Sequence, residues 1–314
     1  MSFSSDVKEE LSKEISPGRH CQIAELTAIL IMECRITSYG PGQYGIRLRT
    51  ENAAAARKFC MLVHRAFHVE PELSVRAETP ESPSCYFAVI ARQEDVLRIL
   101  KAARLVGPDG KAYTDITKQA RLVVLQTCCR RAFIRGAFLA AGSISDPNKS
   151  YHLEIICAEK QIARLLEEMI RTFGITARTI ERKGHFVVYI KESSGIVDML
   201  GIMEASVALM NLENVRIYKE MRNSVNRGVN CETSNIRKTV SAAVKQTEDI
   251  RYIRESAGYS ELPEGLREIA ELRLAYPEAT LKELGEMLDP PVGKSGVNHR
   301  LRRISEIADR YRFQ

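Results

Sequence analysis

The sequence predicts an α+β protein with a duplicated N-terminal domain, a helical linker and an all-α C-terminal domain. An apolar helical segment at residues 26–34 recurs at 134–142, with an offset of 108 residues, and similar patterns of strands and helices follow both copies. The last part of the chain shows only helical periodicity. The expected parts are an N-terminal helix (1–17), the duplicated domain (18–210), a basic helical linker (211–256) and the C-terminal domain (257–314).

The first predicted element is an amphipathic helix over residues 4–16. Ser4 or Ser5 can cap its start, because a serine hydroxyl accepts a hydrogen bond from a free amide of the first turn. Apolar side chains recur on one helical face, at Val7, Leu11 and Ile15. We expect this face to pack on the duplicated domain; the alternative is an arm that binds a partner.

Each copy in the duplicated domain is expected to run helix–strand–strand–helix–strand–strand–helix. In the first copy, strands are predicted at 44–51 and 85–90, and helices at 53–67 and 95–105. In the second copy, strands are predicted at 152–158 and 186–190, and helices at 160–173 and 195–203. Two such copies predict two α+β halves related by a pseudo-twofold axis.

The linker is polar and basic, with few large apolar residues. Its pattern predicts one long exposed helix that is broken near Gly228, since glycine is a poor helix former. The C-terminal domain then shows three short helices. Thr280 and Glu283 have the spacing of a capping box, and Gly285 is small where another helix must cross closely. Residues 289–293 form a turn that cannot continue the helix, and Ser295 is expected to cap the last helix.

Composition limits the classes of partner and cofactor. The net charge of +6 over 314 residues permits nucleic acid as a partner without requiring it. None of the eight cysteines forms a Cys-x-x-Cys pair, which favours reduced core thiols in a cytoplasmic protein over a disulfide framework or a zinc site. We expect no cofactor and no metal. No apolar run is long enough to cross a membrane, so no membrane partner is expected.

The last helix carries the strongest functional pattern. Val297, Leu301, Ile304 and Ala308 fall on one side, and polar or basic residues fall on the other. A short helix, a Pro/Gly turn and a basic helix are typical of a helix-turn-helix, in which Arg can pair with guanine and Asn with adenine. The alternative is a surface helix that is merely basic. Expected DNA contacts in this domain are Thr280, Lys294, Ser295, Gly296, Asn298, His299, Arg300, Arg302 and Arg303.

The amides of Gly296 and Val297, at the start of that helix, are expected to suit a phosphate. The linker adds polar residues at three- and four-residue spacing, which can bridge phosphates or base edges if they share a helical face. A solvated linker face is an equally good interpretation. The linker residues with an expected DNA contact are Arg222, Asn226, Arg227 and Asn230.

Glu33 lies near the end of the first repeated helix, and Ala141 occupies the equivalent position in the second. Paired helices that each end in an acid can hold two divalent metals, which activate water and stabilise a leaving oxygen in DNA cleavage. One of the two acids is missing, and Asp146 is five residues too far along to replace it. We therefore expect no catalytic residue. The alternative is a metal-dependent nuclease that uses Glu33.

Several strings together resemble the WhiA family of Gram-positive bacteria, over essentially the whole chain. They include residues 135–143 (RGAFLAAGS), 230–232 (NCE) and, as the most specific string, 292–302 (VGKSGVNHRLR). The resemblance implies a degenerate LAGLIDADG homing-endonuclease-like domain joined to a helix-turn-helix domain. It also implies a sequence-specific, DNA-binding transcriptional regulator of sporulation and/or cell division and chromosome events, located in the cytoplasm at the nucleoid.

That resemblance implies double-stranded DNA as the main partner. The N-terminal domain is then expected either to keep a sheet that cradles DNA or to dock another transcription or cell-division protein.

Overall fold

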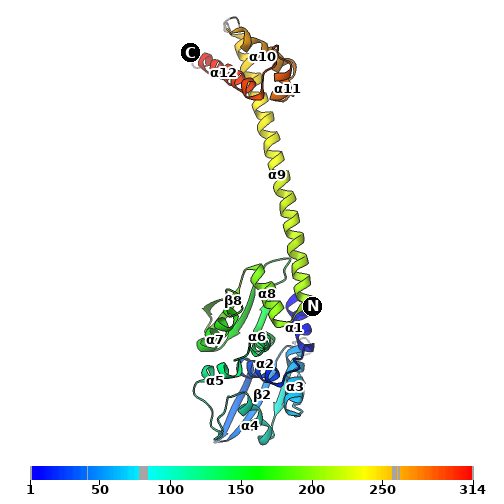
Figure 1. The fold of residues 1–314 in the computed structure, drawn as a ribbon, viewed down its shortest axis with the longest axis vertical. Helices are drawn as coiled ribbons and strands as arrows, with labels where there is room; N and C mark the ends of the chain where they lie inside the picture. The colour runs from blue at the N-terminus through cyan, green and yellow to red at the C-terminus, as the bar shows by residue number, and fades with distance from the viewer. Residues whose placement is uncertain (1, 41, 78–83, 257–259, 261, 313–314) are drawn as a thin grey trace. The chain divides into compact units, whose positions relative to one another are not determined.

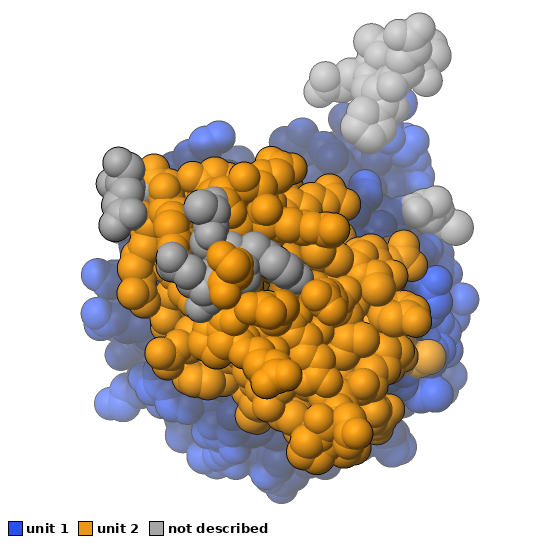
Figure 2. Space-filling model, turned by 90° about the horizontal axis from the view of Figure 1, so that it is seen from above, with its two compact units in different colours: residues 1–219 blue, residues 220–314 orange. Residues whose placement is uncertain are grey.

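The computed structural model describes residues 2–40, 42–77, 84–256, 260 and 262–312. The chain forms two compact units, residues 1–219 and residues 220–314 (Figure 2). Unit 1 contains helices and two β-sheets, whereas helices joined by turns make up the described residues of unit 2. Among the described residues, no helix has both the length and the apolar character that a membrane crossing requires.

Unit 1 contains two halves with the same order of elements (Figure 1). The first half consists of α2 (Arg19–Met32), β1 (Cys34–Gly40), β2 (Gln43–Thr50), α3 (Ala53–Phe67), β3 (Glu72–Arg76), β4 (Cys85–Ile90) and α4 (Gln93–Ala102). The second consists of α6 (Thr127–Ala141), β5 (Gly142–Ile144), β6 (Leu153–Cys157), α7 (Lys160–Arg171), β7 (Arg178–Arg182), β8 (His185–Ile190) and α8 (Ser193–Met203). The predicted α+β duplication is confirmed. A further helix between the halves, α5 (Ile116–Val123), was not predicted.

Both sheets are antiparallel and have the same strand order, β1-β2-β4-β3 in the first half and β5-β6-β8-β7 in the second. Along β2, side chains alternate between the core and solvent, because successive residues of a strand point to opposite faces. Ile46 and Leu48 are buried, and Arg47 and Arg49 are exposed. The residues that face inward join a core made with the helices of the same half.

The two repeated helices, α2 and α6, lie side by side in the middle of unit 1 (Figure 1). Gly136 allows their close approach. A Cβ atom at this position would lie 2.3 Å from the carbonyl oxygen of Glu25 and 3.1 Å from the Cβ of Ala28. Only glycine therefore fits at position 136 without a shift of the backbone.

A buried ionic cluster crosses the same helix pair. Arg135 donates from Nε and Nη2 to the two carboxylate oxygens of Glu25, both at 3.0 Å. Lys58 Nζ lies 3.0 Å from the same carboxylate, and Ser16 Oγ accepts from Arg135 Nη2 at 2.7 Å. Glu204 also pairs with Arg135. Since Glu25, Lys58 and Arg135 are at most 1% exposed, each charge depends on its partners for compensation.

The N-terminal helix α1 spans Phe3–Lys13, and its cap is Ser2, whose hydroxyl accepts from the Ser5 amide at 3.2 Å. The predicted caps and the predicted end at residue 16 were therefore wrong. Val7 and Leu11 are fully buried in the core of the second half. This burial confirms that the helix packs on the domain.

The segment that was expected to be a broken helical linker is one continuous helix, α9 (Ser206–Glu255). The prediction of a break near Gly228 was wrong. A glycine in an exposed helix costs only about 1 kcal/mol relative to alanine, which good helix formers on both sides can offset. No atom lies within 4 Å of the position where a Gly228 Cβ would stand.

Unit 2 consists of the C-terminal part of α9 with α10 (Glu264–Ala275), α11 (Leu281–Glu286) and α12 (Lys294–Arg312). Its core contains Ile250, Ile253, Leu266, Ile269, Leu284, Val297, Leu301 and Ile304, among other apolar residues. An ion pair of 2.8 Å between Arg312 and the buried Asp249 joins the end of α12 to α9. The last turns of α9 are thus part of this core.

The turn between α11 and α12 packs tightly on α11. The predicted capping box is confirmed, because Thr280 Oγ1 accepts from the Glu283 amide and Glu283 accepts from the Thr280 amide. The Val292 amide donates to the Gly285 carbonyl at 2.9 Å. Helix α12 begins at Lys294, so the prediction that Ser295 caps it was wrong; Ser295 lies in the first turn.

Candidate nucleic-acid interface

Helix α12 has one buried face and one exposed polar face. Val297, Leu301, Ile304 and Ala308 are at most 1% exposed, as their helical spacing predicted. The residues on the other side that are exposed are Lys294, Ser295, Asn298, His299, Arg302 and Arg303. The structure therefore presents to solvent the amide, imidazole and guanidinium groups that a recognition helix needs for base edges in a major groove.

Arg302 forms an exposed ion pair with Glu306 on the same helix. Its Nε lies 3.3 Å from Glu306 Oε1, and the two side chains are 79% and 55% exposed. An exposed pair of this kind contributes at most about 1 kcal/mol, so a DNA phosphate or guanine can replace the carboxylate at little cost.

Arg300 is placed differently from the other predicted contacts. It is half-buried, and its Nη1 donates to the Gly265 carbonyl oxygen at 3.4 Å. This bond connects α12 with the first turn of α10. This bond engages only Nη1, so a DNA contact by Arg300 would have to come from its other guanidinium donors or replace the bond.

The start of α12 also differs in detail from the prediction. The amides of Gly296 and Val297 both donate to the Gly293 carbonyl oxygen, at 2.9 and 3.1 Å. They are therefore already occupied, and the prediction that they suit a phosphate was wrong. The exposed side chains of Lys294 and Ser295 are the remaining candidates there. Thr280 is exposed as well, with its oxygen engaged as the cap of α11.

The linker residues Arg222, Asn226, Arg227 and Asn230 are all exposed on α9. Arg222, Asn226 and Asn230 lie at four-residue intervals, so they follow one helical face. Such a row can contact successive phosphates along a strand.

A second basic surface, which the sequence analysis did not single out, lies on the outward face of the first sheet. It consists of four exposed arginines on three strands, Arg35, Arg47, Arg49 and Arg76. Arg35 and Arg47 are direct partners across β1 and β2, and the Arg76 guanidinium lies 5.5 Å from the centre of the Phe87 ring. The alternation of Arg47 and Arg49 with Ile46 and Leu48 is the pattern from which this surface could have been predicted. We call these four residues the arginine sheet face.

Glu33, the remaining acid of the repeated helices, lies at the end of α2. Burial raises the pKa of its carboxyl to about 7, against the opposing effects of a hydrogen bond with Thr50 and the positive charge of Lys8. One of its oxygens, Oε2, is buried without a hydrogen-bond partner. A single carboxyl that burial tends to keep protonated is a poor ligand for a pair of divalent metals.

This burial predicts a pH-dependent effect of Glu33→Gln on stability. In the native chain, the unfolded carboxyl loses its proton near its ordinary pKa, whereas the folded one holds it until about pH 7, so stability falls as the pH rises through this window. The free energy of unfolding of Glu33→Gln should therefore rise relative to native by about 1–2 kcal/mol between about pH 5 and pH 8. Urea titrations at several pH values measure it, with Glu51→Gln at an exposed position as the control. A difference that is flat or falls with pH would contradict the prediction.

Three family descriptions match successive parts of the chain. The WhiA N-terminal LAGLIDADG-like domain matches residues 19–106, the WhiA LAGLIDADG-like domain matches 130–222, and the WhiA C-terminal HTH domain matches 225–308. Together these matches include all of α2, most of α6 and all of α10 and α11.

Relatives of known name are similar over nearly the full length. The "Probable cell division protein WhiA" of Lachnoclostridium phytofermentans is 47% identical over 309 residues, covering 98% of this chain and 99% of the relative. The protein of the same name from Alkaliphilus oremlandii is 49% identical over 311 residues, covering 98% and 97%. Among solved structures, full-length WhiA from Thermatoga maritima is 25% identical, with a TM-score of 0.60 over 99% of both chains.

Proposed function

The chain belongs to the WhiA family, and from this premise we propose that it is a sequence-specific DNA-binding regulator of cell division and chromosome events, without enzymatic activity. The observation that carries the proposal is the exposed polar face of α12 in a helix-turn-helix unit. The names of the relatives, which are probable cell division proteins, support the cellular role. In a spore-forming species this role extends to sporulation, and binding to the chromosome places the protein in the cytoplasm at the nucleoid.

In this proposal, α12 lies in the major groove and different residues have different tasks. Asn298, His299, Arg302 and Arg303 contact base edges and so determine sequence preference. Lys294 and Ser295 contact phosphates next to the groove, and the basic residues of α9 contact phosphates further along. Phosphate contacts fix register and contribute salt-dependent affinity, and they carry no sequence information.

Arg302→Ala tests the groove assignment. We expect it to weaken binding to the preferred DNA by about 1–3 kcal/mol, because it removes a side chain that can pair with guanine, and to relax preference at one base position. The preferred DNA is obtained by selection from a random pool with the native protein, and affinities are measured by fluorescence anisotropy at fixed salt. Arg310→Ala is the matched control, since Arg310 is another exposed arginine of α12 with the same charge. Equal losses in both variants would contradict base readout by Arg302.

The competing function is a metal-dependent nuclease that uses Glu33. We expect supercoiled plasmid to remain intact with the protein and Mg²⁺ or Mn²⁺, since the second acid of a two-metal site is replaced by Ala141. Cleavage in the native protein that disappears in Glu33→Gln would establish the nuclease instead. Cleavage that persists in the variant would indicate a contaminating enzyme.

The arginine sheet face favours a contribution of unit 1 to DNA binding. An extended surface with guanidinium groups on three strands of one sheet suits the phosphates of a duplex. If this surface contacts DNA, Arg47→Ala should weaken binding to preferred and unrelated sequences equally and lower the slope of log affinity against log salt by about 1. Unchanged affinity and slope would favour the alternative, in which unit 1 docks another transcription or cell-division protein.

A further inference from the structure

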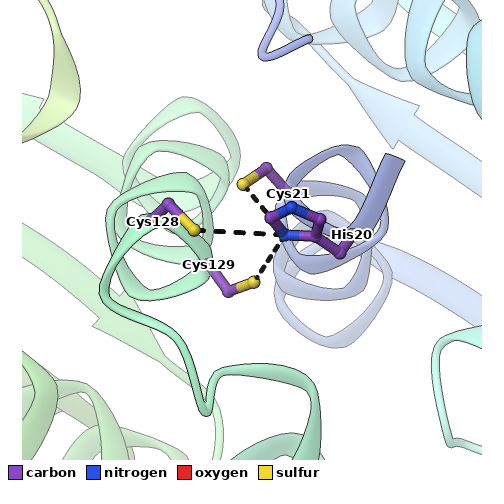
Figure 3. Close-up of side chains that lie close together, drawn as sticks. All are labelled: His20, Cys21, Cys128 and Cys129. Atoms are coloured by element: carbon purple, nitrogen blue, oxygen red, sulfur yellow. Dashed lines mark hydrogen bonds between the residues drawn. The ribbon is translucent and has the colours of Figure 1, made fainter. Parts of the chain in front are cut away.

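Four potential metal ligands cluster at the N-terminal ends of α2 and α6. His20 and Cys21 come from the first turn of α2, and Cys128 and Cys129 come from the first turn of α6 (Figure 3). One donor atom from each residue lies within 4.8 Å of the donor atoms of the other three. His20 Nδ1 lies 3.3 Å from the sulfur of Cys21, 3.2 Å from that of Cys129 and 4.0 Å from that of Cys128.

The duplication explains why these residues meet. At the offset of 108 residues, His20 is equivalent to Cys128 and Cys21 is equivalent to Cys129. A pseudo-twofold axis that passes between two packed helices brings equivalent positions together at their ends. The sequence analysis did not find the cluster, because its two pairs are far apart in the chain and neither pair has the Cys-x-x-Cys spacing of common zinc sites.

The donor set is that of a structural zinc site. Three cysteine thiolates and one histidine nitrogen are a common set for tetrahedral Zn²⁺, with bonds of about 2.3 Å to sulfur and about 2.0–2.1 Å to nitrogen. A tetrahedron with these bond lengths separates its donor atoms by about 3.5–3.8 Å. The distances from His20 Nδ1 to the three sulfurs bracket this range. Small side-chain rotations would therefore complete the coordination.

The surroundings also suit a metal that carries three thiolates. Both ligand pairs sit at the start of a helix, where the helix dipole favours negative charge. Cys21 and Cys129 are buried, whereas His20 and Cys128 are exposed, so an ion can reach the cluster from solvent. A cavity of about 410 Å³ opens beside it and is also lined by Arg131, whose charge can offset the net negative charge of the complex.

We propose that His20, Cys21, Cys128 and Cys129 bind one Zn²⁺ ion that joins the N-terminal ends of the two repeated helices. With four protein ligands, the site leaves no open position for substrate or water, and its role is structural. The ion holds the two halves of unit 1 together at the N-terminal ends of α2 and α6, where Cys21 and Cys129 pack with Ala24 and Ala132. This inference departs from the prediction of no metal and from the interpretation of these thiols as inert core residues.

The test measures metal in the full-length protein. Protein purified without chelators should contain one equivalent of zinc by inductively coupled plasma mass spectrometry. Replacement by Co²⁺ should give the visible absorption bands of tetrahedral thiolate coordination. Strong chelators should lower the melting temperature of the native protein, because the metal binds the folded state.

Two variants at exposed positions, Cys128→Ser and His20→Asn, separate ligation from folding, which circular dichroism monitors. Loss of a group that only orients a metal ligand weakens metal binding by roughly 10–100-fold. Each of these variants removes a ligand itself, so each should weaken Co²⁺ binding by more than this. Cys231→Ser, at an exposed cysteine of α9, is the matched control and should bind normally. Native protein that neither contains zinc nor gives the Co²⁺ spectrum would overturn the proposal. So would affinity unchanged in both variants, or a disulfide among the three cysteines in freshly purified protein.

Discussion

Replacement of Arg135 by methionine should lower the free energy of unfolding of unit 1 by about 3–5 kcal/mol, the usual cost of breaking a buried ion pair from one side. Methionine has a similar length and preserves much of the packing, so the loss reports mainly on charge. Without the guanidinium, Lys58 is the one cation among the described residues that still pairs with the Glu25 carboxylate, at 3.0 Å in a site with no solvent exposure. A desolvated charge with half of its compensation removed is the cause of the expected loss.

Urea unfolding followed by circular dichroism measures this effect, and hydrogen exchange in α2 and α6 assigns it to unit 1. Arg164→Met, at an exposed position of α7, is the matched control and should change stability by less than about 0.5 kcal/mol. The double variant Glu25→Gln with Arg135→Met adds a second check. It should recover none of the loss, because Lys58 then remains a buried cation whose acid partner is gone. A loss below about 1 kcal/mol in the single variant would contradict the argument.

Local periodicity predicted much of the fold, whereas contacts across the repeat could not be predicted. The helix at 53–67 and the strand at 85–90 have the bounds that were expected. In both segments, the spacing of the apolar residues indicates which face is buried. Strand β3, in contrast, alternates polar and apolar residues over only five positions, and all five are exposed, so its pattern marks no buried face. The pairing of Glu25 with Arg135, 110 residues apart, depends on how two helices cross, and single-helix periodicity does not contain that information.

The candidate interface also has some features that could be predicted from the sequence and others that could not. The exposed face of α12 follows from helical spacing alone and was predicted correctly. The hydrogen bond from Arg300 to Gly265 depends on the packing of α10 against α12, so it could not be predicted from periodicity. The two halves of the His–Cys cluster are likewise adjacent only because of the duplication. That DNA lies on this face remains a prediction, which the Arg302 experiment addresses.

Replacement of Gly285 by valine should destabilise unit 2 by about 3 kcal/mol or more, at or beyond the upper end of the usual cost of overpacking. A Cβ atom at this position would lie 2.0 Å from the Val292 carbonyl oxygen and 3.2 Å from Val297 Cγ2. The nearer neighbour is backbone of the turn and cannot rotate away as a side chain can. The turn must therefore move, and the hydrogen bond from the Val292 amide to the Gly285 carbonyl is strained or lost.

Gly228→Val is the matched control, because Gly228 is also in a helix of unit 2 but has no atom within 4 Å of its Cβ position. It should unfold as the native protein does, within about 0.5 kcal/mol. The turn that Gly285 accommodates sets the angle between α11 and α12, so the exposed side chains of α12 reach base edges together only while this packing is intact. In the proposed function, Gly285→Val should therefore lose preference for the selected DNA at a temperature where Gly228→Val retains it. Equal stability and equal DNA preference in the two variants would show that the close packing at Gly285 does not orient the recognition helix.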